Sequence, residues 1–280
     1  TTIKSGSIVS PELPIEFINT GELDIKTTYV LPVTIKSVEG IGVLQSAKTY
    51  YYVFRGASLI NVVCNISRNR AYPDFKNDSK FNNLTENTME ILFKANSFPN
   101  TLNTLMGIES NYLLRIGDAT IPNNQLQVAT SVNNCTSADL QLESGKWYHV
   151  AVAFNKGNVK VYINGVEKLS GSTGKSSVSL GAKHTNEEDG SRCFWVGYSY
   201  KDDRYFDGVV SEVRIWNRAL TAEEIQATNH FYTIEPESEG LIAYWKFDEG
   251  SGTVAKDYSV SGYDLTIEKE PKWESVSLPQ

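Results

Sequence analysis

The sequence is poor in the residues that build disulfide frameworks and metal centres. Its 280 residues include three cysteines and three histidines. Cys64, Cys135 and Cys193 are too few, and too widely spaced, for a disulfide framework or a zinc site made of paired ligands. Two alternatives remain open for them: one Cys135–Cys193 bridge in an oxidising compartment, or three buried thiols.

The three histidines are also far apart in the sequence. None has a second histidine or a cysteine at the short spacing that metal ligands usually show. His149 lies in an apolar run, which predicts a structural histidine with satisfied hydrogen bonds. His184 and His230 are predicted to be isolated and solvated.

Positive charge and long apolar runs are likewise scarce. The chain has 26 basic and 33 acidic residues, a formal charge of −7, and its lysines and arginines are scattered. This pattern argues against nucleic acid and against an anionic membrane surface as partners. No apolar run reaches the roughly 18 residues that a transmembrane segment needs.

The sequence is rich in valine, isoleucine, threonine and tyrosine, which favour strands. Period-two alternation and apolar runs predict strands at residues 89–93, 112–116, 126–128, 146–154, 159–163, 194–198, 209–216, 241–247 and 263–267. Asn164-Gly165 predicts a type I′ hairpin. Thr221 and Glu224 form a capping-box pattern, which predicts one short helix at 222–229. The fold class is therefore an all-β sandwich with one short helix.

The first 66 residues form a separate group of expected strands, at 13–18, 28–35 and 49–54, the last continuing through 57–63. Three strands make a poor independent core. A polar stretch with turn-forming residues follows. We therefore expect a partial β-sandwich domain at residues 1–66 and a larger domain at 67–280.

From about residue 81 the chain resembles the laminin-G-like branch of the concanavalin A-like lectin/glucanase superfamily, whose fold is a jelly-roll sandwich. The matching segments are 88–94, 145–151, 161–165 and 205–220, the last reading YFDG…EVRIWNRAL. A segment that often starts the family, AYWKFDEGSG, stands here at residues 243–252. The resemblance implies that the final strands fill the place of the first ones.

Residues 1–66 resemble half of a small β-sandwich domain that begins many surface lipoproteins of Bacteroidetes glycan-utilisation loci. The phrase YVLPVTI at 29–35 and the tyrosine-rich strand after it carry this match. The pairing implies an exported protein, either an outer-membrane surface lipoprotein whose anchor lies outside this chain or a secreted one. The partners implied are an extracellular glycan and other outer-membrane glycan-uptake proteins.

The best candidate binding site is the loop at residues 197–207. Aromatic faces can stack on sugar rings, and carboxylates and guanidinium groups can bond sugar hydroxyls. The candidate carbohydrate-binding residues are Tyr198, Tyr200, Asp202, Asp203, Arg204 and Tyr205. The acidic stretch at 186–189 is a candidate rim of this site.

Calcium is the candidate cofactor. Carboxylates and backbone carbonyls suit Ca²⁺, and the loop from 248 to 264 is rich in aspartate and glycine. The candidate metal ligands are Asp248, Asp257 and Asp264. Aspartate and glycine also simply form turns, so an ordinary loop is the alternative.

No catalytic motif is evident in the sequence. The Glu-x-Asp-x-x-Glu strand pattern of the glucanase branch is missing, as are a Gly-x-Ser-x-Gly elbow and a phosphate-binding glycine loop. We therefore expect a non-catalytic carbohydrate-binding protein of the cell surface. A protein-binding adhesion module is the alternative, because the fold alone does not separate the two roles. A glycoside hydrolase is less well supported.

Overall fold

A computed structural model describes residues 15–18, 23, 27–39, 42–56, 58–184 and 192–279. It divides into two compact units, residues 1–59 with 279–280, and residues 60–278. The expected strand at 13–18 is not formed at its described residues, 15–18, and residues 13–14 lie outside the described residues. The acidic stretch at 186–189 also lies outside them.

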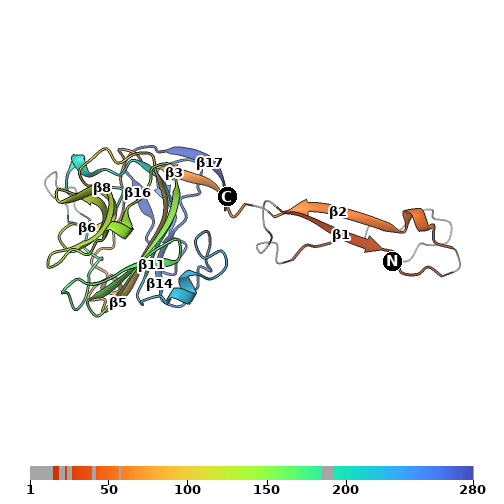
Figure 1. Cartoon of the computed structure of the whole chain (residues 1–280), viewed down its shortest axis with the longest axis horizontal. Helices are drawn as coiled ribbons and strands as arrows, with labels where there is room; N and C mark the ends of the chain where they lie inside the picture. Colours follow the sequence, from red (N-terminus) through yellow and green to blue (C-terminus); the bar gives the residue numbers. More distant parts are fainter. Residues whose placement is uncertain are drawn as a thin grey trace. The chain divides into compact units, whose positions relative to one another are not determined.

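The first unit is built around an antiparallel pair of strands. These are β1 (Thr28–Thr34) and β2 (Thr49–Arg55), and a short 3₁₀ turn, η2 (Gln45–Ala47), precedes β2 (Figure 1). Both strands expose apolar side chains, including Val30, Tyr51 and Val53. Among the described residues of this unit, no second sheet covers the pair.

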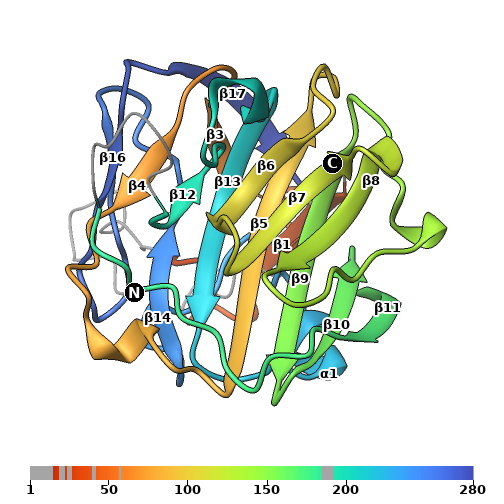
Figure 2. The same ribbon diagram turned by 90° about the vertical axis from the view of Figure 1, so that its left-hand side faces the viewer.

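The second unit is a sandwich of two antiparallel sheets. Within the described ranges, the larger sheet has the order β11-β10-β9-β5-β13-β3-β17, and β14 also pairs with β13; the smaller has the order β15-β16-β4-β12-β6-β7-β8. Figure 2 shows β6, β7 and β8 in front of β5 and β9. The predicted all-β sandwich with one short helix is confirmed for the described residues.

The larger sheet consists of β3 (Ile60–Asn65), β5 (Glu86–Ala95), β9 (Trp147–Asn155), β10 (Asn158–Ile163), β11 (Val166–Ser172), β13 (Gly208–Trp216), β14 (Leu241–Trp245) and β17 (Lys272–Leu278). The smaller consists of β4 (Ala71–Pro73), β6 (Asn103–Ile108), β7 (Tyr112–Asp118), β8 (Ile121–Thr130), β12 (Trp195–Val196), β15 (Val254–Ala255) and β16 (Leu265–Ile267). The helix is α1 (Ala222–Ile225), and the 3₁₀ turns are η3 (Ser79–Phe81), η4 (Ala138–Leu140) and η5 (Asp202–Arg204).

The main core lies between the two sheets, where alternate side chains of facing strands meet. Strand β9 shows the pattern clearly: Val150, Val152 and Phe154 point into this core. Its other face contributes Ala151 and Ala153 to a second apolar cluster with Trp216, Leu220, Ile225 and Tyr244. The segment after β13, which includes α1, therefore covers the outer face of the larger sheet and makes β9 buried on both sides, as predicted.

The structure places the division between the units earlier in the chain than the predicted boundary at residue 66. Strand β3 pairs with β13 and with β17, so it belongs to the larger unit. The polar stretch that set the predicted boundary follows β3 in the sequence. The strands that pair with β3 come much later in the chain, so no local signal assigns β3 to the larger unit. The expected continuation of the β2 strand through residue 63 is therefore wrong.

Candidate functional site

The loop between β12 and β13 is fixed to the sandwich at both ends. The N–H of Gly197 donates a hydrogen bond to Leu105 O, and the N–H of Phe206 donates one to Gly197 O. Gly197 has φ +79°, a conformation that favours glycine, and a Cβ there would lie 3.1 Å from Ile66 Cδ1. Ser199 shares a 2.7 Å hydroxyl–hydroxyl hydrogen bond with Thr104 of β6. The candidate side chains are therefore held on a defined loop.

Tyr198 is part of an aromatic cluster beside this loop. Its ring lies 5.2 Å from Trp195 and 4.9 Å from Tyr205. The Arg70 guanidinium lies 4.5 Å from the Tyr198 ring centre and 4.9 Å from the Trp195 ring centre, which is cation–π geometry. Tyr198 is 5% exposed. Its ring faces contact the protein itself, so Tyr198 supports the neighbouring rings and is poorly placed to stack on a sugar.

Tyr205 lies at the accessible side of the same cluster and is half-buried. Burial raises the pKa of Tyr205 to about 12, Asp202 adds to the rise, and the charge of Arg70 opposes it. The hydroxyl therefore stays protonated at neutral pH and can donate a hydrogen bond. Its position combines an aromatic face with a polar edge.

Arg204 is engaged by another part of the protein. Its Nη1 atom lies 2.9 Å from Glu109 Oε2, and its guanidinium lies 5.4 Å from the Tyr200 ring centre. Tyr200 has a left-handed backbone, with φ +62°. Asp202 and Asp203 on η5 are exposed. Of the six predicted residues, these two carboxylates reach solvent most freely.

Two depressions flank the loop, and each is lined by two of the six predicted residues. The larger has a volume of about 730 Å³, and its walls include Asp202, Tyr205, Arg68 and Lys269. The other, of about 420 Å³, is bordered by Asp203 and Arg204. Pro99 and Asn100 border both, and Asn100 Nδ2 donates to Tyr205 O at 3.0 Å. The larger depression brings together the Tyr205 ring, the carboxylates of Asp202 and Asp207, and two cations.

Asp207 also lines the larger depression and has a structural role. Its carboxylate accepts hydrogen bonds from Ser97 Oγ at 2.6 Å, Ser67 Oγ at 2.8 Å and Asn96 Nδ2 at 3.3 Å. Burial alone would raise the pKa of Asp207, but these donors and the charge of Arg68 lower it. Asp207 is thus an ionised group that fixes the end of the loop.

The predicted calcium ligands do not converge. Asp257 is buried, and its two carboxylate oxygens accept backbone N–H groups of Tyr244, Ser259 and Tyr263 at 2.8–3.0 Å. Asp264 Oδ1 accepts the N–H of Asp257, and the Asp248 side chain is exposed. In the described ranges, these three aspartates do not form a group of converging ligand atoms. Asp257 thus organises a turn through its own hydrogen bonds.

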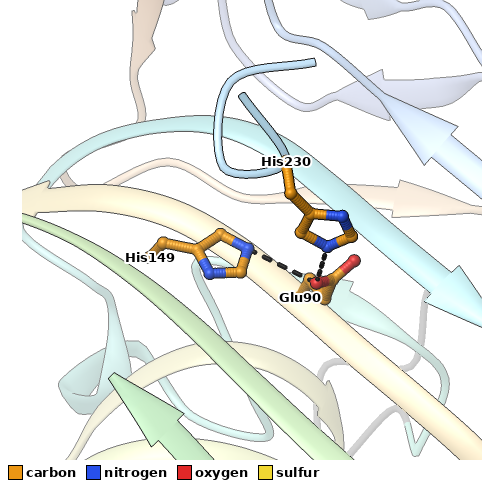
Figure 3. Close-up of side chains that lie close together, drawn as sticks. All are labelled: Glu90, His149 and His230. Carbon is orange, nitrogen blue, oxygen red and sulfur yellow. Dashed lines mark hydrogen bonds and ion pairs between the residues drawn. The ribbon is translucent and has the colours of Figure 1, made fainter. Parts of the chain in front are cut away.

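Sequence reasoning missed a buried ionic cluster on the outer face of the larger sheet. Glu90 Oε1 lies 2.7 Å from His230 Nε2 and 3.5 Å from His149 Nε2. Figure 3 marks both contacts with dashed lines. Glu90 Oε2 accepts Trp216 Nε1–H at 2.7 Å and lies 3.7 Å from Arg214 Nη1. The expectation that His230 is isolated and solvated is therefore wrong.

The same cluster extends to a second carboxylate. Arg214 forms an ion pair with Glu212, and the Tyr244 hydroxyl donates to Glu212 Oε2 at 2.6 Å. Burial raises the pKa of Glu212, although Arg214 and Tyr244 oppose the rise. Burial would also raise the pKa of Glu90, but His149, His230 and Arg214 hold it well below its ordinary value. No local spacing signals these contacts, because the groups come from separate segments.

The cysteines are buried, and no disulfide joins Cys135 to Cys193. Of the two alternatives, a Cys135–Cys193 bridge or three buried thiols, the structure has three buried thiols. Burial raises the pKa of Cys64 and of Cys135, which keeps both thiols protonated. In the part of the chain that the structure describes, no helix is long and apolar enough to span a bilayer.

Comparisons with known proteins identify the superfamily to which the fold belongs. A family model described as the concanavalin A-like lectin/glucanases superfamily matches residues 69–226. A crystal structure of a Bacteroides ovatus protein, for which carbohydrate binding has been suggested, is similar over 91% of this chain and 70% of its own, with 27% identity and a TM-score of 0.67. No curated protein sequence matches the chain.

Two further solved structures are more distant. Domain 4 of the extracellular arabinanase AbnA from Geobacillus stearothermophilus, solved with arabinotriose, has 19% identity and a TM-score of 0.44, covering 74% of this chain and 89% of that one. A pentraxin from Limulus polyphemus has 15% identity and a TM-score of 0.43, covering 62% and 83%.

Proposed function

Since the chain belongs to the concanavalin A-like lectin/glucanase superfamily, we propose that it is a non-catalytic protein that binds an extracellular glycan. The observation that carries the proposal is the depression of about 730 Å³ lined by Tyr205, Asp202, Arg68 and Lys269. The similarity to the Bacteroides ovatus protein, at 27% identity, supports the same function.

The chemistry of this depression suits a sugar. The Tyr205 ring offers an apolar face for the C–H side of a pyranose, and its hydroxyl, with a pKa raised to about 12, remains a donor. Asp202 accepts hydrogen bonds from sugar hydroxyls, while Arg68 and Lys269 donate them. Because Asp202 and Asp207 balance the two cations, the site favours a neutral sugar over a strongly anionic one.

The carboxylates around the loop do not suit glycoside hydrolysis. A glycosidase needs one carboxyl group with a raised pKa as the acid, opposite a second carboxylate. Asp207 has a lowered pKa and three side-chain donors. Asp118, beside the smaller depression, is paired with Arg115. We therefore propose that the protein binds its glycan without cleaving it.

The aromatic cluster explains how the site keeps its shape. Trp195, Tyr198 and Arg70 pack behind Tyr205, so its ring is oriented before a ligand arrives. Pre-ordered side chains lower the entropy cost of binding. Replacing Tyr198 is therefore expected to weaken binding through Tyr205, without a direct contact to the sugar.

The test is a glycan-array screen of the purified protein, followed by calorimetry with the best ligand. Tyr205→Ala and Asp202→Asn should each weaken binding at least about tenfold, a loss of about 1.4 kcal/mol. Asp139→Asn, an exposed aspartate on η4, is the matched control and should bind normally. Binding to no glycan, together with capture of a protein partner, would favour an adhesion module instead.

Placement at the cell surface and the link to glycan-uptake partners belong to the same proposal. They rest on the likeness to the Bacteroides ovatus protein and on the predicted first domain. Fractionation of the native host, with protease treatment of intact cells, tests both. Protection of the protein from external protease would contradict surface exposure.

Calcium at the 248–264 loop stays a prediction. The exposed carboxylates of Asp248 and Asp264 could still bind Ca²⁺ with backbone carbonyls. A ligand that binds only the folded state raises the melting midpoint. Adding CaCl₂ to chelator-treated protein should therefore raise the midpoint, and Asp264→Asn should reduce the rise. An unchanged melting midpoint would contradict calcium binding.

A further inference from the structure

Two histidines and one carboxylate meet beneath the segment that covers the larger sheet. Glu90 on β5 and His149 on β9 lie on the outer face of two paired strands. His230 comes from the segment that follows α1. The Oε1 atom of Glu90 and the Nε2 atoms of the two histidines all lie within 4.8 Å of one another, and Figure 3 shows both rings directed at the carboxylate.

Hydrogen bonds within the protein do not satisfy this group. Glu90 and His230 pair at 2.7 Å, but neither ring nitrogen of His149 has a hydrogen-bond partner among the described residues, and the side chain is fully buried. A neutral imidazole carries a lone pair on one ring nitrogen. Because no hydrogen bond within the described part of the chain engages either nitrogen of His149, that lone pair is available to a cation.

We propose that Glu90, His149 and His230 bind a zinc ion through one carboxylate oxygen and two Nε2 atoms. Zinc prefers these ligands at about 2.0–2.2 Å in tetrahedral geometry, so neighbouring ligand atoms stand about 3.3–3.5 Å apart. The His149–Glu90 separation of 3.5 Å already fits, and the His230–Glu90 separation of 2.7 Å must open by roughly 0.6–0.8 Å. Water supplies the fourth ligand.

The groups around the three ligands match those that orient metal ligands elsewhere. Trp216 Nε1 and Arg214 contact Glu90 Oε2, which leaves Oε1 directed at the histidines. Arg214 Nη1 also donates to His230 O at 2.6 Å and fixes the backbone there. Glu212 neutralises Arg214, so the added charge of the ion is offset by Glu90. His230, at 8% exposure, is the least buried of the three ligands.

The ion has a structural role in this position. It joins the covering segment to two central strands, and the predicted glycan site lies on a different loop. Zinc binding and the proposed glycan-binding function can therefore be tested independently, and failure of one does not affect the other. Its removal should lower stability and leave the loop residues around Tyr205 in place.

The experiment uses the whole chain, treated with chelator, reloaded with ZnCl₂ and exchanged into metal-free buffer. Elemental analysis should find about one zinc per chain, and Co²⁺ in its place should give the visible bands of a four-coordinate site. The melting midpoint should rise on reloading. Wild-type protein that retains no metal would overturn the proposal.

Variants locate the ion. His149→Gln and His230→Gln should lose it, while His184→Gln, which changes the remaining histidine of the chain, should retain it. Retention by both cluster variants, or loss from His184→Gln, would overturn the assignment. If the cluster variants do not fold, X-ray absorption at the zinc edge of the wild type decides. Two imidazoles are expected in the ligand shell, and a sulfur or an all-oxygen shell contradicts the site.

Discussion

At the scale of single residues, contacts from other parts of the fold decide which side chains of the loop at 197–207 are available to a ligand. Tyr205 and Asp202 line the larger depression as candidates for ligand contact. Tyr198 and Arg204 are instead engaged by Arg70, which precedes β4, and by Glu109, which follows β6. Residue type predicts the chemistry available, and the long-range partners decide whether it is free for a ligand.

The buried cluster around Glu90 illustrates the same limit more strongly. A histidine pair at helical or hairpin spacing can be recognised in a sequence, but His149 and His230 are brought together by the fold of the covering segment. Arg214 and Glu212 alternate on one strand and read as an ordinary exposed face. Only the burial of both, at 0% and 2% exposure, reveals the cluster.

Asp207 supports a prediction about stability and pH. Asp207→Asn should destabilise the fold by about 1 kcal/mol at neutral pH, a modest value because the carboxylate is partly solvated. Since its folded pKa is lowered, this contribution is present above the unfolded value of about 3.9 and is lost as pH falls through the folded value. Urea unfolding of both proteins at pH 7 and at acidic pH measures it. A difference that grows on acidification would contradict the account.

At the scale of elements, the strongest local signals gave the correct structures. Asn164 and Gly165 have φ +49° and +76°, the left-handed pair that a type I′ turn between β10 and β11 requires. Thr221 and Glu224 form the complete capping box. The helix ends at Ile225, earlier than predicted, and Gln226 Nε2 donates to Gly165 O. Tertiary contacts override the local tendency to continue it.

The last strand was not predicted. Strand β17 pairs along β3, where Trp273 opposes Cys64 and Lys272 opposes Asn65. Its residues are half-buried or exposed over most of its length, so its alternation is weak. The strand exists because β3 offers an edge to pair with, and that edge lies at the start of the unit.

Gly165 allows a test of the hairpin. Gly165→Ala should cost about 1–2 kcal/mol, because alanine is strained at φ +76° and its Cβ would lie 3.1 Å from Phe231 Cζ. Gly250→Ala is the matched control, with φ +74° and open space around the added Cβ. Denaturant unfolding should show the larger loss for Gly165→Ala. Equal losses would mean that the contact with Phe231 does not matter.

At the scale of the whole molecule, the class of fold followed from the sequence, while the limits of the larger unit did not. The alternation of apolar residues predicts two packed sheets, and both are present in the described chain. The unit closes, however, through the pairing of β3 with β17, which joins its first and last segments. A boundary set by that closure cannot be read from either segment alone.

Two truncations test where the larger unit begins. A chain starting at residue 59 retains β3 and should melt cooperatively, near the midpoint of the same transition in the full chain. A chain starting at residue 67 lacks β3, leaving Val209 and Val210 of β13 and the whole of β17 unpaired on that side. It should melt at least about 10 °C lower, or fail to fold. Similar midpoints for both truncations would refute the assignment of β3.

Calorimetric titration of a glycan-array hit into wild-type protein and Tyr205→Ala tests the central claim most directly. The account predicts saturable binding by the wild type, without release of reducing sugar, and at least about tenfold weaker binding by the folded variant. Unchanged affinity in the variant, or cleavage of the bound glycan, would contradict it.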